Sequence, residues 1–246
     1  MKRLKRILAG ALGFALILGL LVVSLGLSGD PLSEKQAERR AIAYAESLYP
    51  GQTFTVKDVT RDRPFSYRAE VQSTDSVDTR FSVTTDFWVR TSDVDSSGNA
   101  DHVILVEEKW NTRYRLGCEA AKRAAAIFEV ELPEIRFNPL YGVDQDTAFV
   151  DLCCMEEEWE RYKGALVIDM PFDAALLNEM PACLTAVILK DEQPADEELE
   201  EALVRIRTAM EKHGMIFVFY DITLIRADGE GEVLNSGMIA AEEIGG

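Results

Sequence analysis

The chain lacks the residues and motifs on which most enzyme mechanisms depend. Its 246 residues include only two histidines, His102 and His213, and neither has cysteines or acids nearby at a zinc-binding spacing. The signatures G-x-S-x-G, S-x-x-K, H-E-x-x-H, the P-loop and G-x-G-x-x-G are all absent. Acidic pairs are common, but 43 Asp and Glu residues make chance pairing unavoidable, so they do not indicate a glycosidase. The sequence therefore predicts no catalytic residue and no cofactor, and we expect both histidines at the surface.

Basic residues are scarce outside the N-terminal tip. After residue 29 the chain holds 22 basic and 43 acidic residues, a net charge of −21. Such a surface repels phosphate backbones, so the charge excludes nucleic acid as an expected partner and favours basic ones. Hydrophobic residues make up 47% of the chain, which is enough to bury a core and is untypical of a disordered protein.

The N-terminus predicts a membrane anchor. Lys2, Arg3, Lys5 and Arg6 precede residues 7–27, a run of 21 residues without a charge. A helix of that length covers the ~30 Å hydrocarbon core, and the positive-inside rule keeps the basic tip in the cytoplasm. A cleaved signal peptide is the alternative, although its apolar region is normally shorter and no good cleavage site follows here. We expect a single-pass protein of the cell membrane with its bulk outside the cytoplasm.

Residues 30–100 predict a small domain of one helix and an antiparallel sheet. Ser33 is a suitable N-cap, and alanines recur at helical spacing until Pro50 and Gly51 end the helix. Three runs then alternate between apolar and polar residues, at 53–56, 65–71 and 81–89, with polar stretches between them. This pattern is typical of a meander with one face in water.

The same region resembles a known family. A helix, then "YPGQTFTV", then strands that end in "DVDSSGNA", is similar to the layout of PepSY modules, which belong to a wider group of cystatin-like α+β folds. The resemblance covers residues 33–100 and departs from the pattern where a long helix follows directly. It implies a small extracytoplasmic module, in some cases linked to the regulation of peptidases, and it implies no catalytic residue.

Residues 101–246 predict a second α+β domain, joined to the first by a long helix over 101–131. The apolar positions of that helix follow Val103, Val106, Trp110, Tyr114, Cys118, Ala121, Ala125 and Phe128. Strands are expected at 135–137, 148–155, 166–170, 184–189, 215–225 and 233–239, with a helix starting near Pro194. Residues 215–225 are apolar almost throughout, which predicts a central strand covered on both sides.

The stretch "SDVDSSGNADH" is the candidate metal site. Asp93, Asp95, Ser97 and Asp101 occupy ligand positions of a calcium loop, although Ile104 stands where such a loop needs its glutamate. The alternative is a turn that ends a strand and caps the following helix. Calcium is therefore the only cofactor that the sequence suggests. For this stretch we prefer the interpretation as a turn.

Two other features bear on function. Trp88 breaks the alternation of its strand, which indicates either an exposed aromatic for partner binding or a face covered by the long helix. Cys153 or Cys154 could pair with Cys183 outside the cytoplasm, whereas Cys118 is expected in the core. As neighbours on the strand at 148–155, Cys153 and Cys154 should point to opposite faces.

These observations favour a membrane-anchored, extracytoplasmic binding or regulatory module that engages a protein partner without catalysis. Two alternatives belong to other classes. One is a cell-envelope hydrolase whose site the sequence does not reveal, and the other is a structural envelope protein that binds calcium.

Overall fold

The chain folds into two compact units, Met1–Glu108 and Lys109–Gly246, each with its own hydrophobic core. The computed structural model describes residues 10–20, 23–24, 31–63, 66–86, 100–138 and 148–245. The sequence placed the boundary between residues 100 and 101, eight residues earlier.

Of the predicted anchor, residues 10–20 and 23–24 are described, and they are helical. Within the described ranges, no helix is both long and apolar enough to cross a membrane.

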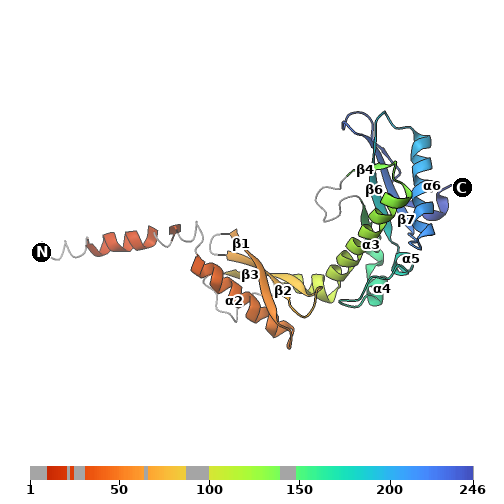
Figure 1. The fold of residues 1–246 in the computed structure, drawn as a ribbon. Coiled ribbons are helices and arrows are strands. Elements are labelled where there is room, and N and C mark those ends of the chain that lie inside the picture. Colours follow the sequence, from red (N-terminus) through yellow and green to blue (C-terminus); the bar gives the residue numbers. More distant parts are fainter. Residues whose placement is uncertain are drawn as a thin grey trace, which may run out of the picture. The chain divides into compact units, whose positions relative to one another are not determined.

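The N-terminal unit is one helix on a three-stranded antiparallel sheet, as the sequence predicts. Helix α2 (Pro31–Leu48) lies along one face of strands β1 (Phe54–Arg63), β2 (Ser66–Ser73) and β3 (Arg80–Asp86), in the order β1-β2-β3 (Figure 1). The π-helical turn η2 (Val103–Glu107) adds Val106 to this core. Small side chains let α2 lie close to the sheet, since Ala41 and Ala45 are fully buried.

Tyr49 closes one end of this core, and its hydroxyl should make the unit sensitive to alkali. The ring packs on Phe54 and Phe81, and within the described residues its buried hydroxyl has no hydrogen-bond partner. Burial, together with the nearby Glu107 carboxylate, raises the pKa of Tyr49 to about 12. The folded state therefore binds the phenolic proton more tightly than the unfolded state, whose pKa is about 10.

We expect the contribution of Tyr49 to stability to be complete below pH 10 and to be lost as the pH rises from 10 to 12. The predicted loss is about 2 kcal/mol by pH 12. Tyr49→Phe, which has no proton to release, should match the natural protein at pH 7 and exceed it at pH 11.5. Chemical denaturation at both pH values measures the difference, and parallel decline of the two proteins would contradict the assignment.

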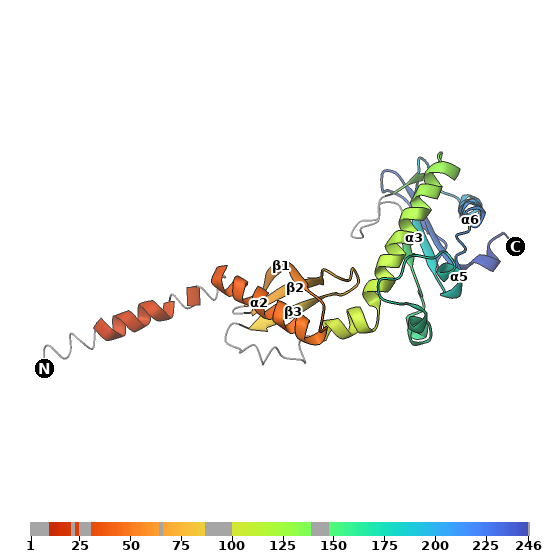
Figure 2. The same cartoon turned by 60° about the horizontal axis from the view of Figure 1, so that its bottom comes forward.

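The C-terminal unit is built on a six-stranded mixed sheet. Strands β6 (Cys183–Lys190) and β7 (Phe219–Arg226) are parallel neighbours at its centre, joined through helix α6 (Asp196–Lys212). Strands β4 (Arg136–Phe137) and β5 (Phe149–Asp151) pair antiparallel with β6, and β8 (Leu234–Asn235) and β9 (Ile239–Ala240) pair antiparallel with β7. Helix α3 (Trp110–Glu131) and the short α4 (Trp159–Tyr162) and α5 (Leu176–Glu179) complete the unit (Figure 2).

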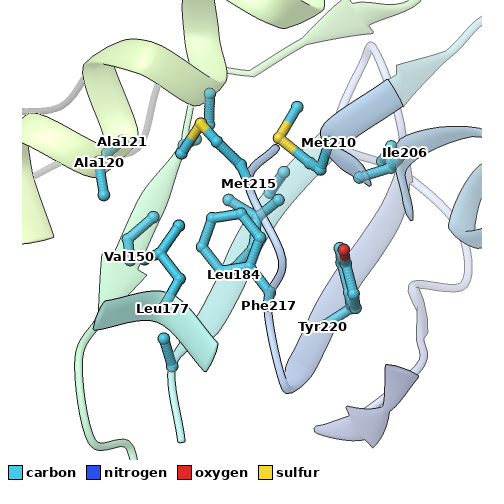
Figure 3. Packing of buried hydrophobic residues seen from close by; sticks show 14 of the residues in the cluster. Ala120, Ala121, Val150, Leu177, Leu184, Ile206, Met210, Met215, Phe217 and Tyr220 are labelled. Atoms are coloured by element: carbon cyan, nitrogen blue, oxygen red, sulfur yellow. The ribbon is translucent and has the colours of Figure 1, made fainter. Parts of the chain in front are cut away.

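One face of this sheet is buried and the other is half-exposed. Leu184 and Tyr220 lie on the buried face and belong to one core cluster with Ile206 and Met210 of α6 and Ala120 of α3 (Figure 3). The opposite residues of β6 and β7 alternate with them and are mostly half-buried. The prediction that β7 is covered on both sides is therefore wrong within the described residues, because both long helices pack on the same face.

The predicted long helix over 101–131 is interrupted. Residues 101–102 are helical and lead directly into η2, and α3 begins only at Trp110. Lys109 separates them in the left-handed conformation, with φ of 61°. Its ammonium donates hydrogen bonds to the carbonyl oxygens of Lys163 (2.9 Å) and Leu166 (2.5 Å), which compensate for the backbone strain.

Three predicted strands differ from the structure. The strand expected at 148–155 ends at Asp151, so Cys153 and Cys154 lie in a turn and do not point to opposite faces of a strand. Residues 166–170 form a turn instead of a strand, with the Met170 N–H donating to the Val167 carbonyl (3.1 Å). The last predicted strand is divided into β8 and β9, with Gly237 at φ of 63° between them.

Candidate functional site

A turn after β5 brings two cysteines together at one end of the six-stranded sheet. Strand β5 ends where Asp151 pairs with Cys183, the first residue of β6. Cys153 then adopts a left-handed conformation, with φ of 62°, which reverses the chain. The Cys154 N–H donates to the Pro181 carbonyl oxygen at 3.0 Å, and its Sγ lies 3.0 Å from the same oxygen. Cys154 is thereby held beside β6.

The thiols of Cys154 and Cys183 form a hydrogen bond, and their acidities differ as a result. The pKa of Cys154 is lowered because the Cys183 thiol donates to its sulfur. The pKa of Cys183 is raised for the same reason and by burial, with further repulsion from the Cys154 thiolate and from Asp221. Cys154 is half-buried and Cys183 buried, so the more acidic thiol is also the more accessible.

A buried arginine holds the other side of this turn. The Arg113 guanidinium, 6% exposed, donates to Asp151 Oδ1 through Nη2 (2.6 Å) and Nε (3.2 Å), and to the Cys153 carbonyl oxygen (3.0 Å). It also lies over the rings of Trp110 and Trp159, at 4.6 and 5.1 Å from their centroids. Since the charge is paired and stacked, we assign Arg113 a structural role in fixing the turn.

The chemistry available to this arrangement is thiol exchange. Burial raises the pKa of Cys153, whose sulfur faces the Met155 carbonyl oxygen at 3.6 Å, so this thiol is not activated. Across the described ranges, no group of three or more His, Cys, Asp and Glu side chains is placed to hold a metal ion.

A pocket of about 250 Å³ lies at the carboxyl end of β6, beside the first turns of α6. Oppositely charged residues on its wall already pair with one another: Lys190 with Glu198 (2.5 Å), Arg136 with Asp191 (2.5 Å) and Arg205 with Glu134. A charged ligand would have to displace one of these pairs, so the pocket offers no preformed charge for recognition.

Most of the residues predicted as sites lie outside the described part of the chain. This applies to Asp93, Asp95 and Ser97 of the candidate calcium loop and to Trp88. Asp101 is described and lies, half-buried, in the helical turn before η2. The calcium and partner assignments therefore stay predictions.

The two histidines differ in their surroundings. His213 follows the last residue of α6, is 39% exposed and lies 2.8 Å from a Glu131 carboxylate oxygen. The expectation of a surface histidine is wrong for His102, whose side chain is only 13% exposed. It packs edge-on against Tyr44 and tilted against Phe81, because the turn that carries it folds onto the core of the N-terminal unit.

Sequence reasoning found Cys154 and Cys183 as possible partners but missed the arginine that orders the turn. One sequence feature could have indicated it, namely the polar segment Asn111, Thr112 and Arg113 in the first turn of α3. All three residues are buried. Cys118 was expected in the core but is half-buried.

Comparison with known proteins places only the first part of the chain. No curated protein and no solved structure matches it. One family model matches the first part of the chain, which includes the predicted anchor, α2 and the three-stranded sheet. The description of that family names neither PepSY nor cystatin-like modules. Residues 4–95, less than half of the chain, match the family described as YfjL-like, N-terminal domain.

Proposed function

We propose that this protein is a membrane-tethered, extracytoplasmic binding module that takes up an extended segment of a protein partner along strand β3, without catalysis. The observation that supports it best is the regular outer edge of β3. A PepSY-like role, in which a small α+β module regulates a neighbouring protein, would be one form of this function.

The hydrogen-bond pattern of the sheet defines that edge. The Ser73 N–H donates to the Thr79 carbonyl oxygen at 2.9 Å, so odd-numbered residues of β3 face β2. The backbone N–H and carbonyl of Ser82 therefore point to the outer edge, where β3 pairs with no other strand of the described ranges. The β2–β3 register has no bulge, whereas the β1–β2 register has two, which makes β3 the better template for an added strand.

The N-terminal helix supports a tether. Residues 10–20 expose apolar side chains on several sides, among them Leu12, Phe14 and Leu20, each about two-thirds exposed. Such a surface is costly in water, and a bilayer would cover it. The basic tip favours an orientation with the N-terminus in the cytoplasm and both compact units outside.

The charge distribution supports a basic partner. The C-terminal unit holds 13 basic and 28 acidic residues, a net charge of −15, whereas the N-terminal unit holds 13 and 15. An acidic field attracts positively charged partners and raises their association rate, and salt screens this effect.

The proposal is tested by affinity capture from detergent-solubilised membranes with the full-length chain. Ser82→Pro removes an N–H that faces the outer edge, so capture should fall at least tenfold, while Ser82→Ala keeps the N–H and should capture normally. Raising the salt from 50 to 500 mM should weaken capture by the natural protein. The melting temperatures of both variants serve as the control for folding.

Equal capture by the proline and alanine variants would contradict binding at β3. The tether is tested in the same cells by adding protease to intact spheroplasts, which should digest both compact units. Protection of the chain, or its recovery in the soluble fraction, would contradict the proposed topology.

A further inference from the structure

The Cys154 and Cys183 thiols, at the amino end of β6, play no part in the proposed binding function. The Asp151–Cys183 pair ends the β5 ladder, and the Cys154 N–H is fixed to the Pro181 carbonyl oxygen at 3.0 Å. The first contact fixes the backbone at Cys183, and the second fixes the backbone at Cys154. The Cys154 Sγ also lies 3.0 Å from the Pro181 carbonyl oxygen, two residues before Cys183, so the Cys154 thiol is held next to the start of β6, where Cys183 lies.

The structure distinguishes Cys154 from its neighbour as the partner of Cys183. Cys153 is fully buried, and its sulfur faces the Met155 carbonyl oxygen at 3.6 Å. Cys154 is half-buried, so an external disulfide can reach its sulfur. From the sequence alone, Cys153 and Cys154 are both possible partners of Cys183. In a strand that runs through residue 155, they would point to opposite faces.

Cys154 and Cys183 also differ in exposure and acidity, as thiol–disulfide exchange requires. Cys154 is the accessible thiol and ionises first, because the Cys183 thiol stabilises its thiolate through a hydrogen bond. Cys183 is 5% exposed, so it is protected from an external disulfide. A partly exposed attacking thiol with a protected second thiol nearby is the arrangement that completes exchange without release of the mixed disulfide.

We propose that Cys154 and Cys183 form a site of reversible disulfide formation, with a small-molecule or protein disulfide as the oxidant. The Cys154 thiolate attacks one sulfur of the external disulfide, which forms a mixed disulfide and releases one thiolate. Cys183 then loses its proton to solvent and attacks the Cys154 sulfur, which releases the second thiolate. Two protein thiols are oxidised to one disulfide, and the external disulfide is reduced to two thiols. This inference is independent of the proposed binding function.

The disulfide would lock the segment that covers one end of the C-terminal core. The two cysteines enclose 28 residues, which include the buried Trp159, Leu166 and Leu177. Closing a loop of this length restricts the unfolded chain, so the oxidised protein should melt about 10 °C above the reduced protein.

The experiment equilibrates the purified full-length chain with mixtures of oxidised and reduced glutathione. Tryptic peptides are then analysed by mass spectrometry without reduction, and the melting temperature is measured in parallel. We expect a peptide linked through Cys183 and a higher melting temperature under oxidising mixtures, both reversed by excess dithiothreitol. Cys153→Ser and Cys118→Ser should keep the link and the shift, whereas Cys154→Ser should lose both.

Cys183→Ser should stop after the first step and hold one glutathione on Cys154, which separates attack from resolution. If this variant does not fold, Cys154→Ser still decides the matter, because its side chain is half-buried and serine is close in size. A link that survives Cys154→Ser, a link that disappears in Cys153→Ser, or no linked peptide under oxidising glutathione would overturn the proposal.

Discussion

Replacing Gly117 with alanine should destabilise the C-terminal unit by about 2 kcal/mol, although alanine is the better helix former. A Cβ at this position would lie 2.5 Å from the Val150 carbonyl oxygen. That oxygen belongs to β5, which is paired with β6 and cannot move without breaking the ladder. Overpacking of this kind costs about 1–3 kcal/mol or more, which exceeds the gain of about 1 kcal/mol in helix propensity. Gly117→Val should be worse.

Gly164→Ala is the matched control, because nothing lies within 4 Å of a Cβ added there and its φ is not positive. It should change the free energy of unfolding by less than about 0.5 kcal/mol. Urea denaturation followed by tryptophan fluorescence compares the variants. If Gly117→Ala proves as stable as the control, α3 does not approach β5 as closely as the structure shows.

Gly117 also explains why the apolar stripe predicted for α3 is only partly correct, with Ala121 and Phe128 buried as expected. The apolar repeat through Tyr114 and Cys118 predicts a core stripe, yet Tyr114 is 38% exposed. The buried face also includes residues outside the predicted stripe, namely Arg113, Leu116, Ala120, Ala124 and Ile127. A glycine and a buried arginine do not register as core residues in a periodicity argument, so the predicted stripe was shifted around the helix.

The N-terminal unit was predictable because its pattern is local. Alternation along β2 and β3 and alanines at helical spacing in α2 each report burial directly, and all three elements are present. The break at Lys109 was not predictable, because the carbonyls that hold its ammonium come from residues 54 and 57 positions further along the chain.

The candidate site was predictable only in part for the same reason. The sequence contains four cysteines, but it cannot tell which sulfurs lie close together. The answer depends on a left-handed turn at Cys153 and on the ion pair between the buried Arg113 and the half-buried Asp151, which are separated by 38 residues. Neither feature can be recognised from neighbouring residues in the sequence. The pairing of Cys154 with Cys183 can therefore be identified only from the three-dimensional fold.

The ion pair that holds this turn leads to the second large effect. Asp151→Ala should lower the stability of the C-terminal unit by about 3 kcal/mol, because it leaves the Arg113 guanidinium buried without a carboxylate. The Cys153 carbonyl and the rings of Trp110 and Trp159 would still face the cation, but they cannot neutralise it. Asp151→Asn keeps an acceptor oxygen and should lose less. Urea denaturation at pH 7 measures each difference.

A double variant separates an unpaired charge from a simple loss of contacts. Arg113→Met places a flexible apolar side chain against the two indoles, so the pair Arg113→Met with Asp151→Ala contains no buried charge to compensate. We expect this double variant to be more stable than Asp151→Ala alone by at least about 1 kcal/mol. Additive losses from the two substitutions would show that Arg113 is not held by Asp151 and that the turn at Cys153 has another source of order.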